Sequence, residues 1–486
     1  MRSDGRDPDF DLRDLAIRAM GERGLLAEFP EAVTEELTRL PAPVAEGAID
    51  QRALPWCSID NDDSRDLDQL TSSERLAGGA IRVRIAVADV AARVRAGSAI
   101  DLHAAHNTTS VYTPACIFPM LPERLSTNLT SLNPGVDRLA TVAELDIDPR
   151  GDISASRIYR AQVHNHAKLA YDSVAAWLDG TAPAPAAVAK DPILQQQLHE
   201  QDEAAQCLRA RRHQLGALDL ETIEARAVMR DGRPVELRQQ RKNRARQLIE
   251  DLMIAANGAA ARFLAGRGWA SIRRVVRTPE RWDRIVDVAA GLGGHLPGAP
   301  DAAALERFLA ERRRSDPLRF PDLCLTVVKL MGKGEYVVER PGEATGHFGL
   351  AVRDYAHSTA PNRRYPDLIT QRLIQAALAG QPSPYPDEEL ERLAGHCTEQ
   401  EDNADKVERR VRKSAAALML RDRIGTRYDA LVTGAADKGT WVRTLAPPVE
   451  GKVVRGPRGL QVGDQVRVEL LGVDVEQGFI DFAVLR

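Results

Sequence analysis

The chain has 486 residues, of which 43% are hydrophobic and 28% are charged, and its formal net charge is −4. This length is sufficient for about three domains with a large core, so disorder is not expected. No stretch approaches the roughly 18 uncharged apolar residues of a membrane helix, and the first ten residues lack the apolar segment of a signal peptide, so we expect a cytoplasmic protein without a membrane partner.

The apolar pattern changes three times along the chain. Residues 11–40 carry apolar positions at helical spacing, which predicts a small helical domain over 1–48, either helix-turn-helix-like or a simple helical cap. Residues 50–240 are predicted to be rich in strands, with alternation at 81–90 and 139–147 and an Ala/Pro surface loop at 179–192. Residues 247–424 are predicted to be largely helical, including helices over 248–263 and 366–379.

The last 60 residues return to short strands separated by glycines, a pattern typical of a small barrel. The five cysteines are far apart and never form C-x-x-C, which argues against a disulfide framework and against a zinc site. The net charge does not favour binding to a polyanion, although basic residues gather in three runs. These runs are residues 209–213, 238–246 and 409–413, and we expect the second to lead a polyanion towards a site.

Five aspartates lie between positions 60 and 68, in the segment SIDNDDSRDLDQ. Asp66 and Asp68 project to one side of an extended chain, and a turn through residues 61–64 can bring Asp60 back towards them. Hard oxygen ligands in this arrangement suit Mg²⁺, although a solvated turn has the same composition. A calcium-binding EF-hand is rejected because Ser64, Arg65 and Thr71 all break its pattern.

A second cluster comprises HFGL at 347–350 and YAHSTAPNRRYPDL at 355–368. Arg363 and Arg364 stand just before a predicted helix, where fork-shaped donors add to the positive end of the helix dipole. This combination favours a phosphate site, although a pair of arginines is also common in surface ion pairs.

Taken together, these two segments resemble the signature motifs of the ribonuclease II and RNase R (RNB) family. The resemblance covers roughly residues 50–425. It also includes residues 89–90, 97–98, 110–112, 119–122, 216–220 and 249–257.

The resemblance implies an α+β fold, with an RNB catalytic domain over 49–424 formed by a mixed β-barrel wrapped by helices. It implies a monomeric, processive 3′-to-5′ exoribonuclease that hydrolyses single-stranded RNA to nucleoside 5′-monophosphates. The implied cofactor is Mg²⁺, as one or two ions, with Mn²⁺ as a substitute. The implied site residues are Asp66, Asp68 and Arg363 for catalysis, Asp60, Asp66, Asp68 and Gln69 for the metal, and Tyr112, Arg363, Arg364 and Glu408 for RNA. Glu408 is equally suited to pairing with Arg412 on a helix surface.

The chain departs from the family pattern at several positions. Gln69 stands where the family has a fourth aspartate, which removes one charged metal ligand. Ala360, Asn362 and Ala86 replace the usual Ser, Ile and His. Only 59 residues precede Asp60, too few for the two cold-shock domains that usually open these proteins. Gln69 is the one feature that points to the alternative function, a catalytically impaired RNA-binding protein of the same fold. A phosphorolytic or DNA-directed nuclease is a third possibility.

The C-terminal residues 425–486 resemble the S1 RNA-binding domain, an OB-type barrel. Such barrels bind single strands by stacking bases on aromatic side chains in a basic groove. Trp441 is the expected platform, with a plain core position as its alternative, and Lys438 occupies a position where a second aromatic is usual.

Overall fold

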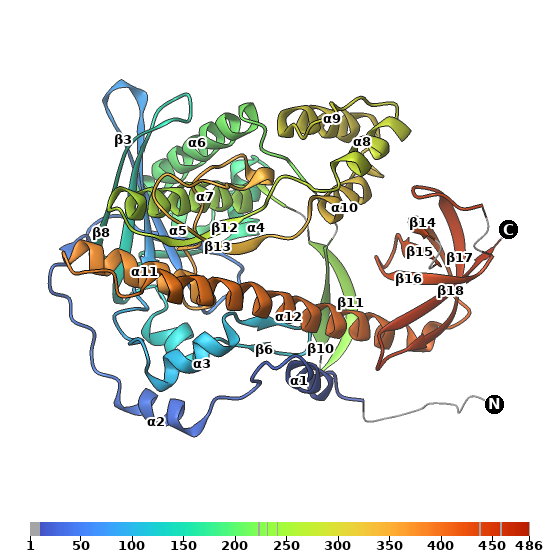
Figure 1. Ribbon diagram of the computed structural model, residues 1–486, viewed down its shortest axis with the longest axis horizontal. Helices are drawn as coiled ribbons and strands as arrows, with labels where there is room; N and C mark the ends of the chain where they lie inside the picture. Colours follow the sequence, from blue (N-terminus) through green and yellow to red (C-terminus); the bar gives the residue numbers. More distant parts are fainter. Residues whose placement is uncertain are drawn as a thin grey trace.

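The computed structural model describes residues 10–221, 224–230, 232–240, 242–436, 439–456 and 459–485. Figure 1 shows a central sheet at one end, a small barrel at the other, and the long helix α12 (Asp387–Leu420) running between them. Across the described ranges, we find no helix with the length and apolarity that would let it span a bilayer.

The central sheet has seven strands in the order β1-β8-β7-β4-β3-β2-β9. It is mixed, because β1 pairs with β8 and β2 pairs with β9 in parallel while the other pairs are antiparallel. The strands are β1 (Ile49–Asp50), β2 (Cys57–Asp60), β3 (Gln69–Arg75), β4 (Ile81–Ala88), β7 (Asp137–Ile147), β8 (Ile153–His164) and β9 (Ala167–Ala170). The two strands predicted from alternation, β4 and β7, are confirmed and pair with each other.

Both faces of this sheet are buried. In β4, Val83, Ile85 and Val87 face helices α6 (Pro192–Gln214) and α7 (Arg244–Gly266), whereas Ala86 and Ala88 face the cluster that contains α11 (Tyr365–Leu378). Successive strand residues point to opposite faces, so one strand supplies both cores. The predicted helices α7 and α11 are confirmed.

The expectation of a strand-rich region over 50–240 is wrong for α6, a 23-residue helix. Asp191 caps it by accepting hydrogen bonds from the backbone N–H groups of residues 193 and 194, and Pro192 occupies its first turn. Its buried residues Leu194, Leu198, Ala205 and Leu208 are spaced as on a helix face, so the signal was present but masked by the many polar residues between them.

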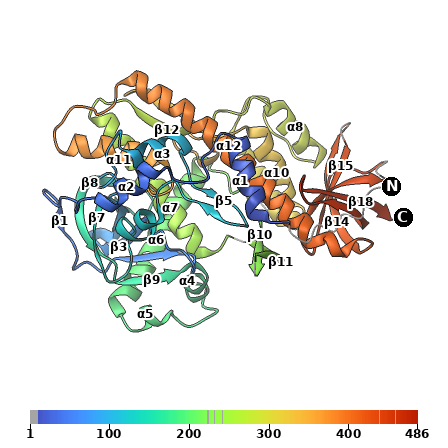
Figure 2. The same ribbon diagram turned by 90° about the horizontal axis from the view of Figure 1, so that it is seen from below.

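The two N-terminal helices pack against the rest of the molecule. Figures 1 and 2 both place α1 (Leu12–Glu22) beside α12, and its buried Ala16, Ala19 and Met20 share a cluster with Val407 and Val411. α2 (Glu31–Arg39) lies against α3 (Ala99–Asn107).

The remaining elements complete the body. Its helices are α4 (Tyr171–Leu178), α5 (Ala186–Ala189), α8 (Trp282–Gly291), α9 (Ala302–Ser315) and α10 (Phe320–Met331), with short turns η1 (Ala77–Gly79), η2 (Arg124–Leu129), η3 (Phe348–Leu350) and η4 (Arg421–Arg423). Its two-stranded sheets are β5 (Val111–Tyr112) with β6 (Ile117–Phe118), β10 (Glu224–Arg230) with β11 (Arg233–Gln240), and β12 (Ser271–Val275) with β13 (Glu335–Glu339).

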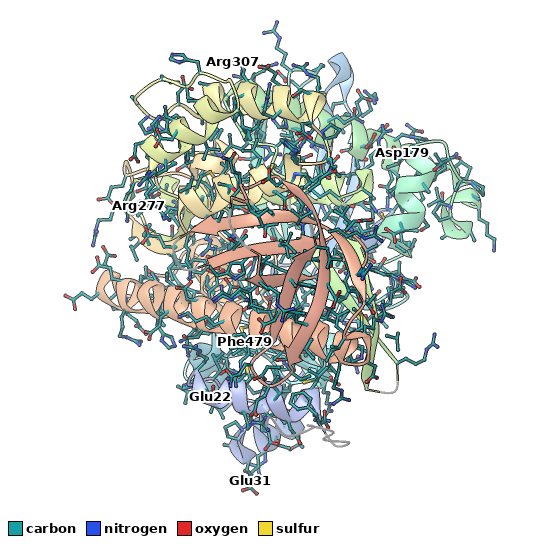
Figure 3. The ribbon with its side chains drawn as sticks, turned by 90° about the vertical axis from the view of Figure 1, so that its right-hand side faces the viewer. Glu22, Glu31, Asp179, Arg277, Arg307 and Phe479 are labelled. Carbon is teal, nitrogen blue, oxygen red and sulfur yellow. The ribbon has the colours of Figure 1, made fainter. Side chains whose placement is uncertain are left out.

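The predicted C-terminal barrel is confirmed as a closed barrel of order β14-β15-β16-β18-β17, and Figure 3 looks onto it. Its strands are β14 (Arg427–Ala436), β15 (Gly439–Thr444), β16 (Glu450–Arg455), β17 (Gln465–Asp474) and β18 (Phe479–Leu485). The Arg443 guanidinium on the barrel lies 2.8 Å from the Asp322 carboxylate on α10, and both side chains are largely buried. This pair joins the barrel to the body.

Candidate active site

The acidic segment connects β2 to β3. Asp60 ends β2, and a turn in which the backbone N–H of Ser64 donates to the carbonyl of Asn61 (3.1 Å) reverses the chain. Lys168 on β9 fixes this turn, because its ammonium donates to the carbonyls of residues 62 (3.0 Å) and 64 (2.7 Å). Leu67 is buried between Asp66 and Asp68 in the segment that precedes β3, and its side chain belongs to the hydrophobic core.

The arginine segment is held from three directions before α11 begins. The Asp367 carboxylate accepts from the backbone N–H of Ala360 at 2.8 Å. The Asn257 side chain on α7 accepts from both the backbone N–H and the hydroxyl of Ser358 at 2.8 Å. The carbonyl of Arg363 accepts from the backbone N–H of Ser110 at 3.0 Å, which joins this segment to the approach to β5.

The two segments meet at Asp68. One Asp68 oxygen accepts from the Asn362 amide nitrogen at 2.9 Å, and the other lies 3.2 Å from Nε of Arg363. These contacts join residues separated by 294 and 295 positions. The predicted neighbours Asp68 and Arg363 are therefore in direct contact.

Tyr112 and Glu408 extend the same site towards α12. The backbone N–H of Tyr112 donates to a Glu408 carboxylate oxygen at 2.8 Å, and its hydroxyl donates to Asp66 at 3.5 Å. The Arg412 guanidinium lies 4.0 Å from Glu408, so the pairing expected on the helix surface is observed, while a role of Glu408 in RNA binding stays a prediction. Tyr112 is 39% exposed, which leaves part of its ring open to a ligand.

Burial and mutual repulsion raise the pKa values of the aspartates. Burial, with a smaller contribution from Asp66, raises the pKa of Asp68 to about 7, although Arg363 opposes this shift. Burial also raises the pKa of Asp66, and the nearby Asp60 adds to the effect. Asp66 and Asp68 thus lie near one guanidinium, with Asp60 close to Asp66, an electrostatic environment that favours a further cation.

The donor set suits a hydrated magnesium ion. In the described part of the chain, no three His, Cys, Asp or Glu side chains form a ready-made metal cage. Mg²⁺ does not need one, because it keeps several waters and binds through one or two carboxylates together with substrate phosphate. Among the residues that the structure describes, Asp60 and Asp66 form no ion pair with a basic side chain, and their carboxylate oxygens are of the kind that this requirement calls for. Gln69 is less well suited, since its amide nitrogen donates to the carbonyl of Thr359 and only its oxygen remains to act as a ligand.

Arg364 and Trp441 lie outside the acidic cluster. The Arg364 guanidinium donates at 2.8 Å to the buried Asp367 carboxylate in the first turn of α11, and the Arg364 side chain is half-buried. Trp441 is half-exposed and alternates with the fully buried Val442, so it lies on the outer face of the barrel, with the Lys452 ammonium 5.9 Å from its ring. Lys438 lies outside the described residues.

The structure adds site residues that sequence reasoning missed. Arg246 reaches the acidic turn and stacks on Tyr171, and Asn362 donates to Asp68. The run 238–246 did indicate Arg246, but nothing in the sequence indicated its partners. In the first basic run, Arg209, Arg211 and Arg212 all form ion pairs with aspartates. Arg241 of the second run lies outside the described residues.

A mixed α/β body that carries the carboxylate and guanidinium site, followed by a closed five-stranded barrel, is the architecture that the known families are compared with. The sequence matches the RNB domain over residues 48–380 and the RNase II-type exonuclease C-terminal S1 domain over residues 426–485. The chain belongs to the RNB family.

Curated relatives and solved structures agree with this assignment. Ribonuclease R of Vibrio cholerae is 31% identical over 504 residues, an alignment that covers 94% of this chain and 60% of the relative. The Escherichia coli ribonuclease R alignment has the same identity and coverage, so the chain spans about 60% of the length of these relatives. Mycoplasma genitalium RNase R in complex with ribose-methylated single-stranded RNA superimposes with a TM-score of 0.89 at 23% identity, over 98% of this chain and 78% of that one. Yeast Ssd1, a pseudonuclease, superimposes with a TM-score of 0.74 at 16% identity, over 96% of this chain and 57% of that one. These two superpositions show a shared fold.

Proposed function

We propose that this chain is a processive 3′-to-5′ exoribonuclease that hydrolyses single-stranded RNA to nucleoside 5′-monophosphates with Mg²⁺. The observation that carries the proposal is the contact of Asp68 with Arg363, made beside Asp66, Tyr112 and Glu408. This arrangement sets carboxylates, a guanidinium and an open aromatic ring around one point. A phosphate with an adjacent base fits those three kinds of group.

In this mechanism, the protein positions the last phosphodiester for attack by water. The N–H groups of Arg363 that do not face Asp68 hold the scissile phosphate, and the Tyr112 ring stacks on the terminal base. Asp60, Asp66 and Asp68, with the Gln69 oxygen, would hold the Mg²⁺ ion, which would supply the Lewis acidity that activates a water and neutralises developing charge. The new bond joins the water oxygen to phosphorus as the bond to the leaving 3′ oxygen breaks. That oxygen takes up a proton, and the released nucleotide carries a 5′-phosphate.

Metal removal gives the direct test. Single-stranded RNA labelled at its 5′ end is expected to shorten from the other end in Mg²⁺, to remain intact with excess EDTA, and to shorten again when Mg²⁺ is restored. Chromatography of the products should show nucleoside 5′-monophosphates without added phosphate, and a DNA oligonucleotide should survive. Degradation that persists in EDTA, or that requires phosphate, would contradict the proposal.

A catalytically impaired RNA-binding protein is the second candidate function. Gln69 favours it, because its amide is tied to the Thr359 carbonyl and the site has one carboxylate fewer than the family pattern. The likeness in fold to the pseudonuclease Ssd1 shows that this architecture also occurs without nuclease activity. In the labelled-RNA assay, this candidate predicts a stable complex and no shortening at any Mg²⁺ concentration.

The barrel makes a separate prediction about affinity. Replacing Trp441 by alanine is expected to weaken binding of long single-stranded RNA about tenfold, because one base–aromatic stack is worth roughly 1–3 kcal/mol. Cleavage of a tetranucleotide should stay near the parental rate, since so short a strand cannot occupy the barrel and the active site together. Fluorescence anisotropy measures the first effect. Val454→Ala is the control, because Val454 is exposed on the neighbouring strand β16. Equal affinity of the Trp441 variant and this control would exclude the stacking role.

A further inference from the structure

A second guanidinium approaches the acidic turn from the side of α7. Arg246 lies in the first turn of that helix, and its backbone N–H donates to the side chain of the capping residue Asn243 at 2.9 Å. Its Nη2 atom donates to the side-chain oxygen of Asn61 at 2.7 Å. Asn61 directly follows Asp60, and its own backbone N–H donates to the Asp60 carboxylate at 2.7 Å. Arg246 thus reaches the Asp60 carboxylate through one intervening residue.

The same guanidinium lies over the ring of Tyr171, 4.4 Å from the ring centroid. Tyr171 begins α4 immediately after β9, and β9 pairs in parallel with β2 so that Ala170 lies opposite Asp60. Asp60 and Tyr171 therefore lie at the adjacent C-terminal ends of two paired strands, β2 and β9. Burial raises the pKa of Tyr171 to about 12, with a further contribution from Asp60 and opposing ones from Arg246 and Arg363. We call Asn61, Tyr171 and Arg246 the brace.

Arginine suits this position for a geometric reason. A planar guanidinium can stack its face on a ring while its edge donates a hydrogen bond in the same plane. A lysine ammonium carries the same charge but is compact and has no flat face, so it does not combine a stacked contact with an in-plane hydrogen bond. Both contacts of Arg246 are with neutral groups, so they fix its position without neutralising its charge.

We propose that Arg246 is a positioning residue that acts through Asn61 and Tyr171 to hold the Asp60 carboxylate in the orientation required to bind a divalent cation. The inference rests on the proposed function, because it assigns Asp60 to the metal. Partners of this kind, which orient a ligand without touching the ion, typically change metal affinity by about 10- to 100-fold. The competing role is direct contact between the Arg246 charge and an RNA phosphate.

Binding of Mn²⁺ to the protein without RNA separates these roles. Titration followed by electron paramagnetic resonance gives the affinity of wild-type protein, Arg246→Lys, Asn61→Ala and the double variant. We expect each single variant to weaken Mn²⁺ binding at least about tenfold. We expect the double variant to bind Mn²⁺ no more weakly than the weaker-binding single variant, because both substitutions break the same contact between Arg246 and Asn61. At saturating Mn²⁺, the turnover of Arg246→Lys should return towards the parental value.

Arg267→Lys provides a matched control. Arg267 follows the last turn of α7, and its guanidinium lies over the Phe263 ring, 5.4 Å from the ring centroid. The substitution and the type of contact therefore match those of Arg246→Lys. At a rise of 1.5 Å per residue, Arg267 lies about 30 Å along the helix from Arg246. Its Mn²⁺ affinity should equal that of the wild type, and circular dichroism checks the fold of every variant.

Three outcomes overturn the inference and are distinguishable from one another. If Arg246→Lys and Asn61→Ala bind Mn²⁺ as tightly as the wild type, the brace does not position a ligand, while the proposed function stands. If the wild-type protein binds no Mn²⁺ at all, the proposed metal site fails and the brace fails with it. RNA affinity, measured by fluorescence anisotropy on Arg246→Lys and on a further variant, Arg246→Met, gives the third. If only Arg246→Met loses RNA affinity and Arg246→Lys binds both Mn²⁺ and RNA normally, Arg246 contacts the phosphate instead.

Discussion

Replacing Asp68 by asparagine is expected to reduce cleavage of single-stranded RNA by a factor on the order of 10³ or more, while RNA affinity changes little. Asp68 is 3% exposed and contacts Asn362 and Arg363. Asparagine keeps its shape but removes the charge that the proposed ion requires. Loss of metal-assisted charge stabilisation costs several kcal/mol, and each 1.4 kcal/mol is about tenfold in rate. Binding should persist because it depends on the Tyr112 ring, Arg363 and the barrel.

Single-turnover cleavage and anisotropy, measured on the same preparation, check the two halves of this prediction. Asp62→Asn is the matched control, because Asp62 belongs to the same acidic turn but is exposed. It should cleave at close to the parental rate. A parental rate for Asp68→Asn would refute the assigned roles, and a matching loss in Asp62→Asn would show that total charge in the turn is what matters.

Replacing Arg372 by methionine is expected to lower the free energy of unfolding by about 3–5 kcal/mol, the usual cost of leaving one member of a buried ion pair without its partner. Nη2 of Arg372 on α11 lies 2.6 Å from the Asp101 carboxylate on α3, and both side chains are at most 8% exposed. Arg372 also donates to the hydroxyl of Tyr385 at 2.9 Å and to the carbonyl of Val94 at 2.9 Å. Methionine fills similar space but leaves the Asp101 charge buried.

Urea denaturation followed by fluorescence measures this change. Arg340→Met is the control, because Arg340 pairs with Asp387 and Glu391, each at 3.0 Å, on the exposed surface. Exposed pairs contribute about 0–1 kcal/mol, so this control should lie near the parental stability. Equal stability of the two variants would show that the buried pair between α3 and α11 contributes no more to stability than an exposed pair does.

Local patterns predicted those elements whose periodicity was clean. Alternation gave β4 and β7, and regular apolar spacing gave α7 and α11. The helix α6 was not predicted because polar residues on it, such as Gln197, Gln201 and Asp202, are buried. They form hydrogen bonds with β3 and α7 instead of facing solvent. Patterns of polarity assume that polar side chains face water, and α6 breaks that assumption.

The site was partly predictable for a different reason. The motifs identified Asp60, Asp66, Asp68, Tyr112, Arg363 and Glu408 together, and the fold brings these residues to one place. Arg364 shows the limit of the motif, because it stands beside Arg363 in sequence yet points inwards to Asp367. Neighbouring residues before a helix point in different directions, so the backbone at this corner determines which guanidinium faces the carboxylates.

The sequence alone was enough to determine the family, the acidic and arginine segments, and a barrel at the C-terminus, because each of these depends on motifs whose residues are close together in the sequence. Only the tertiary structure decided that Gln69 is tied to Thr359, that Trp441 lies on the outer face of its barrel, and that Arg246 reaches Asn61 across 185 positions. These contacts depend on how α7, the central sheet and the segment before α11 pack together. Packing of that kind follows from the shape of the whole core, which no local pattern encodes.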